Sequence, residues 1–224
     1  MFVGGTLAAV LLSAILIVLG RVSSRELSIA PQPTASTSTT TSTPAVIAYG
    51  TSLGAPNAPV TLVIYSDFQC YFCQQFALGY EKQLETTYVA EGKVRLVYRH
   101  IVAYGDESEL AAEASECAAE QNQFWPYHDL LMQLRLSSTS ADLTPEKAVD
   151  LARQLGLNVD TFSASLTSGR FRVKVAQEDT EARALGITNI PKFYFNGVVA
   201  DDSIGKSFAA FQEIIDAELA RLGK

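Results

Sequence analysis

The chain is poor in basic residues, in cysteine and in histidine. It carries 17 Lys and Arg against 24 Asp and Glu, for a formal net charge of −7. Nucleic-acid binding needs a basic face, so this balance disfavours DNA or RNA as a partner. Three cysteines in 224 residues are too few for a scaffold held together by disulfides. No nucleotide, flavin or metal motif is present, and we expect no cofactor.

Charge is also missing from one long stretch, residues 2–20. As a helix these residues would span roughly 28 Å, about one hydrocarbon core. No basic region precedes them, and the small residues ending at Ala30 are followed by Pro31, a poor cleavage context. We therefore expect residues 1–22 to be an uncleaved transmembrane anchor. A cleaved secretory signal is the alternative.

A linker and one large domain follow the anchor. Residues 23–45 are rich in Ser, Thr and Pro, a composition that cannot bury a core and serves as a tether. By the positive-inside rule, Arg21 and Arg25 would by themselves keep the residues after the anchor in the cytoplasm. Long domains, however, translocate largely regardless of flanking charge. We therefore expect a single-pass protein of the cell membrane, with residues 46–224 as an extracytoplasmic domain.

The domain has the pattern of an α/β fold. Residues 60–65 and 93–99 read as buried strands, joined by a helical stretch that ends near residue 88. A helical insertion is expected at about 104–170, with Thr144 and Pro145 as the cap and first residue of one helix. A helix over 171–185, a hairpin turning at Asn196 and Gly197, and a helix over 207–222 complete the order.

Two cysteines three residues apart, Cys70 and Cys73, stand where the first strand gives way to a helix. Residues i and i+3 share one helical face, so the two sulfurs can bond or separate with little backbone movement. The unpaired N–H groups at a helix start favour negative charge, so Cys70 can ionise near neutral pH. This pattern is typical of thiol–disulfide exchange, with Cys70 the more exposed sulfur and Cys73 the resolving one.

Two other interpretations of the pair are open. A structural disulfide would close a tiny loop and stabilise little through chain entropy. A zinc site needs two further ligands, for which Cys117 and His128 could be proposed. Cys117, however, lies on an Ala/Leu stripe and reads as a buried, inert thiol.

Other polar and aromatic residues near these positions have plainer interpretations. His100 and His128 read as packing or surface residues, and Trp125 as part of the core of the helical insertion. Asp67 could influence thiol ionisation, although a hydrogen-bonded loop aspartate is the simpler reading. Lys192 would add positive charge only if its side chain turned toward the sulfurs.

Taken together, six segments resemble the DsbA-like thiol–disulfide oxidoreductases of the thioredoxin superfamily. They are residues 54–61, 65–73, 98–100, 111–117, 124–129 and 186–193. The resemblance implies a thioredoxin-like α/β fold with an inserted helical subdomain, preceded here by the N-terminal transmembrane helix. It also implies that Ile190–Pro191 is a cis bond facing Cys70 and Cys73, and that Tyr71, Phe72, Ile190 and Pro191 contact substrate.

The same resemblance implies the activity and the partners. The protein would form disulfides in unfolded or reduced exported proteins, and a membrane quinone-linked thiol oxidase would reoxidise it.

The two residues between the cysteines differ from those of the strongest oxidants in the family. Those oxidants carry Pro-His, whereas Tyr71 and Phe72 bring neither charge nor imidazole. We therefore expect a moderately lowered pKa for Cys70 and an intermediate redox potential. A reductase or isomerase of the same fold, or a non-catalytic metal-binding module, are the alternatives. No added dimerisation domain is present, so we expect a monomer.

Overall fold

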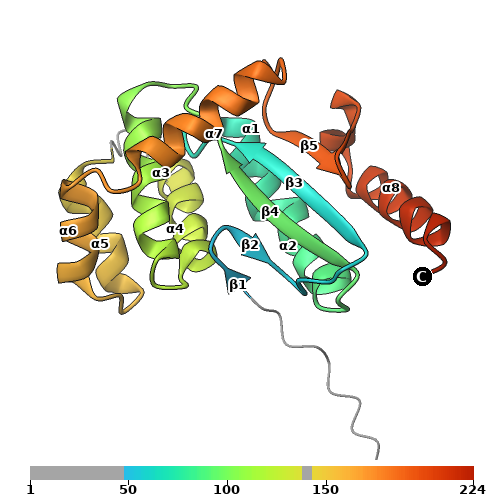
Figure 1. Ribbon diagram of the computed structural model, residues 1–224, viewed down its shortest axis with the longest axis horizontal. Helices are drawn as coiled ribbons and strands as arrows, with labels where there is room; N and C mark the ends of the chain where they lie inside the picture. The colour runs from blue at the N-terminus through green and yellow to red at the C-terminus, as the bar shows by residue number, and fades with distance from the viewer. Residues whose placement is uncertain (1–47, 138–142) are drawn as a thin grey trace, which may run out of the picture. The chain divides into compact units, whose positions relative to one another are not determined.

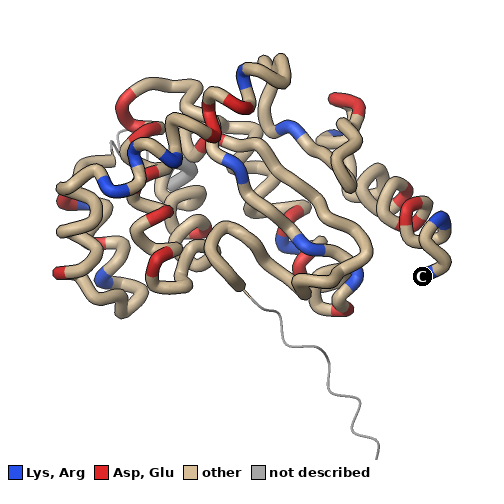
Figure 2. The backbone as a smooth tube through the Cα atoms, viewed as in Figure 1, with Lys and Arg blue, Asp and Glu red and all other residues tan. Residues whose placement is uncertain are grey.

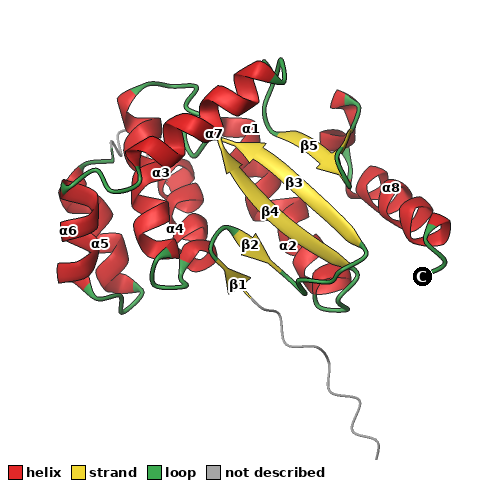
Figure 3. Ribbon diagram, viewed as in Figure 1, coloured by secondary structure: helices red, strands yellow, loops and turns green. Residues whose placement is uncertain are grey.

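The computed structural model describes residues 48–137 and 143–224, whose strands form one six-stranded sheet (Figure 1, Figure 3). The strand order across the sheet is β1-β2-β4-β3-β5-β6. The strands are β1 Ala48–Tyr49, β2 Ser52–Leu53, β3 Val60–Ser66, β4 Val94–His100, β5 Lys192–Phe195 and β6 Val198–Val199. Strands β3 and β4 are parallel, and the other neighbouring pairs are antiparallel.

The register of the central pair decides where the site forms. It runs from Val60 opposite Val94 to Ser66 opposite His100, so both strands end at the same edge of the sheet. Cys70 follows β3 by four residues, and the loop of residues 101–105 follows β4 directly. Two segments far apart in sequence therefore leave this edge side by side.

A continuous helical run connects these two strands. It consists of α1 Tyr71–Phe76, η1 Ala77–Glu81, α2 Lys82–Leu84 and η2 Glu85–Val89. The run matches the helix predicted up to residue 88, but η1 and η2 are π-helical, with bonds such as Ala90 N–H to the Glu85 carbonyl.

The helices after β4 lie beside the sheet (Figure 1). They are α3 Asp106–Ala119, α4 Phe124–Ser137, α5 Pro145–Gln154 and α6 Val159–Thr167, all within the stretch predicted as an insertion. Thr144 caps α5 by accepting a hydrogen bond from Lys147 N–H, with Pro145 in the first turn, as predicted. Helix α7 Arg172–Ala184 then returns the chain to the sheet.

The chain ends in the predicted hairpin and helix. Asn196 and Gly197 have φ of 47° and 84°, the left-handed backbone that a type I′ turn requires. The Asn196 side chain also accepts from Thr61 N–H at 2.8 Å, which ties the turn to β3. A short 3₁₀ segment, η3 Asp202–Lys206, precedes helix α8 Phe208–Arg221.

Aromatic side chains hold the helices to the sheet. Phe76 of α1, Phe193 of β5 and Phe211 of α8 meet with ring centroids 4.7 to 5.4 Å apart. On the insertion side, Tyr98 of β4 and Phe124 of α4 are 5.3 Å apart. Burying each such side chain contributes about 1.5–3 kcal/mol, so these contacts hold α1, α8 and α4 against the sheet.

Some elements differ from the sequence-based expectation. The hairpin of β1 and β2 was not predicted, nor was η3. No helix within residues 48–137 and 143–224 is long and apolar enough to cross a membrane. The predicted anchor at 1–22 and linker at 23–45 lie outside the described residues.

Candidate active site

Cys70 lies between the end of β3 and the start of α1, in extended conformation (φ −77°, ψ 119°). Its backbone N–H donates to the Asp67 carbonyl at 3.1 Å. Its Sγ accepts a hydrogen bond from the backbone N–H of Cys73 at 3.3 Å. The sulfur therefore occupies the N-cap position of α1, where the helix terminus favours a thiolate. Cys70 and Cys73 are both free thiols in this structure.

The surroundings of Cys70 lower its pKa from 9.0 to about 7. The largest cause is the hydrogen bond from the Cys73 thiol, and the backbone N–H groups of Cys73 and Phe72 add to it. Burial and the negative charge of Asp67 oppose the shift. A moderate lowering was expected for a pair with Tyr71 and Phe72 between its cysteines.

Cys73 is the deeper of the two thiols, and burial raises its pKa well above the ordinary value. Cys70 is the more exposed of the two, as expected, but both residues are nearly covered: Cys70 is 2% exposed and Cys73 0%. The Ile190 carbonyl accounts for part of this cover, since it accepts from Cys70 Sγ at 3.7 Å. Only a small part of the Cys70 sulfur can therefore be reached from solvent.

The residues predicted to contact substrate lie around this opening. The Ile190–Pro191 bond is cis, as the resemblance implied. Tyr71 and Phe72 are 59% and 69% exposed, and the centroids of their rings lie 5.6 Å apart. Large aromatic side chains this exposed mark a surface that can bind an apolar partner.

A groove of about 550 Å³ begins beside the cysteines. Its lining includes Phe72, Pro191 and Phe193, and the segment η3 forms part of its wall. Lys192 forms an ion pair with Asp202 of η3 within this lining. Its charge is therefore partly neutralised by a neighbouring carboxylate.

Asp67 is buried, and its carboxylate is fully engaged in hydrogen bonds. It accepts from the backbone N–H groups of Gln69 and Ala103, both at 2.7 Å, and from the Ser108 hydroxyl at 2.9 Å. Burial raises the pKa of this carboxyl. The hydrogen-bonded interpretation is confirmed, and the bonds join the Cys70 segment to the loop after β4.

Sequence reasoning missed Tyr104, which lies in that loop. It is 58% exposed; burial raises its pKa, and the negative charge of the neighbouring Cys70 sulfur adds to the shift. Nothing in its immediate sequence marks it. The available signal was topological, because loops at the carboxyl ends of neighbouring parallel strands meet at one edge.

The histidines and the third cysteine lie in the core. His100 and His128 are 1% and 0% exposed, and His100 Nε2 contacts a Glu116 oxygen at 3.0 Å. They are packing residues, as predicted, but neither is at the surface. Cys117 is 1% exposed, which confirms the predicted buried thiol, and burial raises its pKa to about 12.

The zinc alternative is not supported. Within residues 48–137 and 143–224, the one group of three potential ligands is Glu81, His128 and Asp129, which contains no cysteine. The Lys82 ammonium already lies 2.7 Å from Asp129 Oδ2, where it would repel a cation. Burial raises the pKa of Glu81, which favours the protonated carboxyl and so disfavours metal ligation by this residue.

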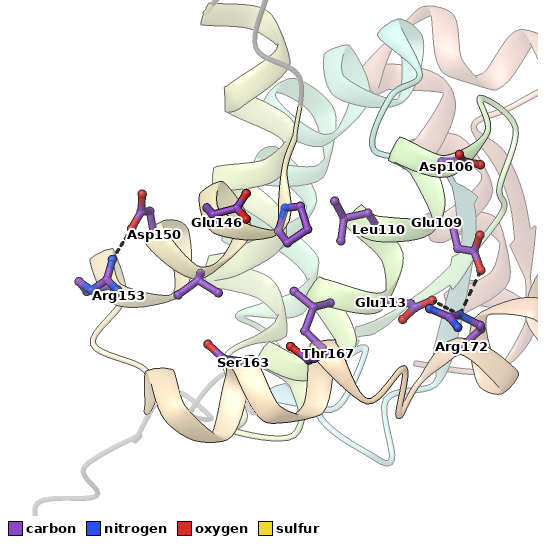
Figure 4. Close-up of a pocket in the computed structure, with 13 residues that line it drawn as sticks. Asp106, Glu109, Leu110, Glu113, Glu146, Asp150, Arg153, Ser163, Thr167 and Arg172 are labelled. Carbon is purple, nitrogen blue, oxygen red and sulfur yellow. Dashed lines mark hydrogen bonds and ion pairs between the residues drawn. The ribbon is translucent and has the colours of Figure 1, made fainter.

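A second cavity, of about 700 Å³, lies among helices α3, α5 and α6 (Figure 4). Its acidic side chains are largely paired: Arg172 Nε contacts Glu113 at 3.0 Å, and Arg153 pairs with Asp150. Neither Cys70 nor Cys73 lines it. Acidic and basic residues are likewise interspersed along the described chain in the view of Figure 2.

Comparison with known proteins agrees with this arrangement. A family model described as Thioredoxin matches residues 35–217. The chain is 29% identical over 182 residues to the probable disulfide bond formation protein D of Bacillus anthracis, covering 79% of this chain and 82% of that protein. It is 34% identical over 146 residues to the Na⁺/H⁺ antiporter NhaA 3 of Salinispora tropica, but covers only 21% of that protein.

Among solved structures, oxidised BdbD from Bacillus subtilis shares the fold, with a TM-score of 0.68 and 23% sequence identity. The match covers 78% of this chain and 98% of that one. The thioredoxin-like α/β fold predicted from the sequence is thereby confirmed. The chain belongs to the DsbA-like thiol–disulfide oxidoreductases of the thioredoxin superfamily, and it is a protein-disulfide oxidoreductase.

Proposed function

We propose that Cys70 and Cys73 are the redox pair of this enzyme and that it forms disulfide bonds in exported proteins. The observation that carries the proposal is the asymmetry of the two thiols. Cys70 caps a helix with a pKa of about 7, whereas burial raises the pKa of its partner Cys73. One sulfur is therefore suited to be exchanged with substrate and the other to resolve the intermediate.

The reaction begins with the pair oxidised. A substrate thiolate attacks Cys70 Sγ, the Cys70–Cys73 bond breaks, and Cys73 leaves as a thiolate that takes up a proton. A second substrate thiolate then attacks the substrate sulfur of the mixed disulfide and releases Cys70 as a thiolate. The substrate has lost two electrons and two protons, and the pair has gained the two electrons.

Substrate binding would use the exposed surface around the opening. The Ile190–Pro191 loop offers backbone to an extended chain, and Tyr71 and Phe72 offer apolar contact. The groove lined by Phe72 and Phe193 can take apolar side chains next to the reacting cysteine. Such a site favours unfolded chains, which present extended backbone and apolar residues together.

The location and the electron acceptor are part of the same proposal. Residues 1–22 would anchor the protein in the cell membrane, with the catalytic domain extracytoplasmic, where disulfides persist. A membrane quinone-linked thiol oxidase would reoxidise the pair. The Bacillus anthracis relative is described as a probable disulfide bond formation protein, which supports the oxidising direction.

A reductase or isomerase role is the second candidate, and one observation favours it. A pKa of about 7 for Cys70 equals the value of about 7 for thioredoxin rather than the value of about 3.5 for DsbA. A less stabilised thiolate means a less oxidising pair.

The equilibrium constant with glutathione tests the direction. We expect a potential between about −270 mV, the thioredoxin value, and about −120 mV, the DsbA value. A value at the lower limit, together with failure to oxidise a reduced substrate protein, would reject the oxidase role in favour of reduction. Protease accessibility of the domain in intact cells tests its location.

Single-cysteine variants test the residues. Cys70→Ala should abolish insulin reduction, and Cys73→Ala should accumulate a mixed disulfide at Cys70 that gel electrophoresis without reductant can detect. Turnover by Cys70→Ala at the rate of the unaltered enzyme would show that the pair is not catalytic.

A further inference from the structure

Two pockets meet beside the Ile190–Pro191 bond. The groove of about 550 Å³ lies on the side of Phe193, and a smaller pocket of about 290 Å³ lies on the side of Tyr194. Successive residues of a strand point to opposite faces of the sheet, so the two pockets open on opposite faces. The residues that line both pockets are Asn189, Lys192 and Asp202, and we call these three the shared border.

The carboxylate of Asp202, the first residue of η3, holds the shared border together. It forms an ion pair with the Lys192 ammonium and accepts a hydrogen bond from Asn189 Nδ2 at 3.5 Å. The Lys192 side chain is 20% exposed and that of Asp202 59%, so the lysine is the more covered partner. A chain that crosses the border therefore meets a lysine whose charge already has a carboxylate beside it.

The shared border lies close to the reacting sulfur. The Ile190 carbonyl accepts from Cys70 Sγ at 3.7 Å, and Ile190 stands between Asn189 and Lys192 in the chain. Consecutive residues of an extended chain are about 3.3 Å apart. A substrate cysteine bonded to Cys70 therefore places the residues that flank it near the border.

We propose that Asp202 is a positioning residue for substrate selection: it neutralises Lys192 at the shared border, so that the site takes neutral and apolar segments around a substrate cysteine and gives acidic ones no advantage. The proposal rests on the redox role proposed for Cys70 and Cys73. An unpaired ammonium at this place would attract a carboxylate near the substrate cysteine, because opposite charges attract more strongly where water is partly excluded.

The test compares the full-length protein with Asp202→Asn on two reduced peptides that each contain two cysteines. The peptides are identical except that the residues flanking the first cysteine are Glu in one and Gln in the other. Their oxidation, with oxidised glutathione as the final acceptor, is followed by mass spectrometry. The readout is the kcat/KM for the Glu peptide divided by that for the Gln peptide, and comparing this ratio between proteins cancels any effect of Glu on the peptide thiol itself.

Asp202→Asn should raise the ratio about two- to fivefold, mainly through KM, because it leaves the Lys192 charge unpaired. The increase should shrink in 1 M salt, where charges are screened beyond about 3 Å. Asp201→Asn is the matched control. It removes the same charge one residue earlier, where the carboxylate accepts from Ser203 N–H at 2.8 Å and an asparagine can still cap η3, so the ratio should stay nearly unchanged.

A double variant identifies the source of the attraction. Lys192→Gln combined with Asp202→Asn should return the ratio to that of the unaltered protein. A ratio for Asp202→Asn equal to that of the unaltered protein overturns the inference, and so does a raised ratio that persists when Lys192 is also replaced. If the unaltered protein oxidises neither peptide faster than Cys70→Ala does, the proposed function itself fails, and the inference with it.

Discussion

The backbone N–H of Cys73 donates to the Sγ of Cys70 across 3.3 Å, so helix α1 is capped by a sulfur that can also be bonded to Cys73 itself. The Sγ of Cys70 thus both caps helix α1 and can form the disulfide with Cys73. The protonation state of Cys70 therefore affects the stability of the reduced protein as well as its reactivity.

Ionisation of Cys70 should stabilise the reduced protein, relative to a Cys70→Ser variant, increasingly as pH rises from about 7 to 9. The pKa of Cys70 is about 7 in the folded protein and 9.0 ordinarily, so in this window the unfolded chain binds a proton that the folded protein has lost. Below pH 7 both states are protonated and the contribution vanishes. Urea unfolding of the reduced protein and of Cys70→Ser at several pH values measures the difference. A parallel pH dependence of the two proteins would contradict a lowered pKa.

Replacement of Asp67 by Asn should destabilise the protein by about 1–3 kcal/mol. The carboxylate accepts from Gln69 N–H, Ala103 N–H and the Ser108 hydroxyl, and an amide would turn an NH₂ group toward one of these donors. Ser108→Ala is the matched control, because it removes a single donor and should cost less. Urea midpoints measure both, and an Asp67→Asn variant as stable as the Ser108→Ala variant would show that the carboxylate does not hold the loop.

Cys117 should take no part in redox chemistry. Its thiol is buried, and with a pKa of about 12 its thiolate fraction at pH 8 is on the order of one in ten thousand. Brief alkylation of the native reduced protein should therefore label Cys70 and spare Cys117. Cys117→Ala should keep the glutathione equilibrium unchanged. Labelling of Cys117 at a rate near that of Cys70 would be incompatible with its place in the core.

Phe211→Ala should cost roughly 3–5 kcal/mol of the free energy of unfolding. The ring is fully buried and meets Phe193 at 5.0 Å and Phe76 at 5.4 Å, so its removal leaves a cavity beneath α1. Phe208, on the same helix but only partly buried, is the control and should cost less when replaced by Ala. Denaturant unfolding gives both values, and equal losses would show that α8 is not anchored through Phe211.

Local patterns in the sequence predict much of this fold. The two apolar runs at 60–65 and 93–99 become β3 and β4, and Asn196 and Gly197 take the turn that their chemistry favours. Each depends on residues close together in sequence. Strands β1 and β2 could not be found this way, because two residues are too few for alternation. Strand β2 pairs with β4, and β1 pairs in turn with β2, so both depend on a strand more than 40 residues later.

Local sequence likewise predicts some features of the candidate site and not others. The spacing of Cys70 and Cys73 predicts their shared helical face and the moderate lowering of the pKa of Cys70. The near-complete burial of Cys70 depends on Ile190, which lies 120 residues later in the sequence. Contacts of this range follow from the packing of the whole sheet, which no local pattern encodes.

The Ile190 carbonyl covers a sulfur 120 residues earlier in the chain. Proteins are synthesised from the N-terminus, so Cys70 emerges from the ribosome long before the segment that shields it. A nascent or truncated chain that ends before residue 190 already carries the complete thiol pair without its cover. The cover over Cys70 can therefore form only after most of the polypeptide has been made.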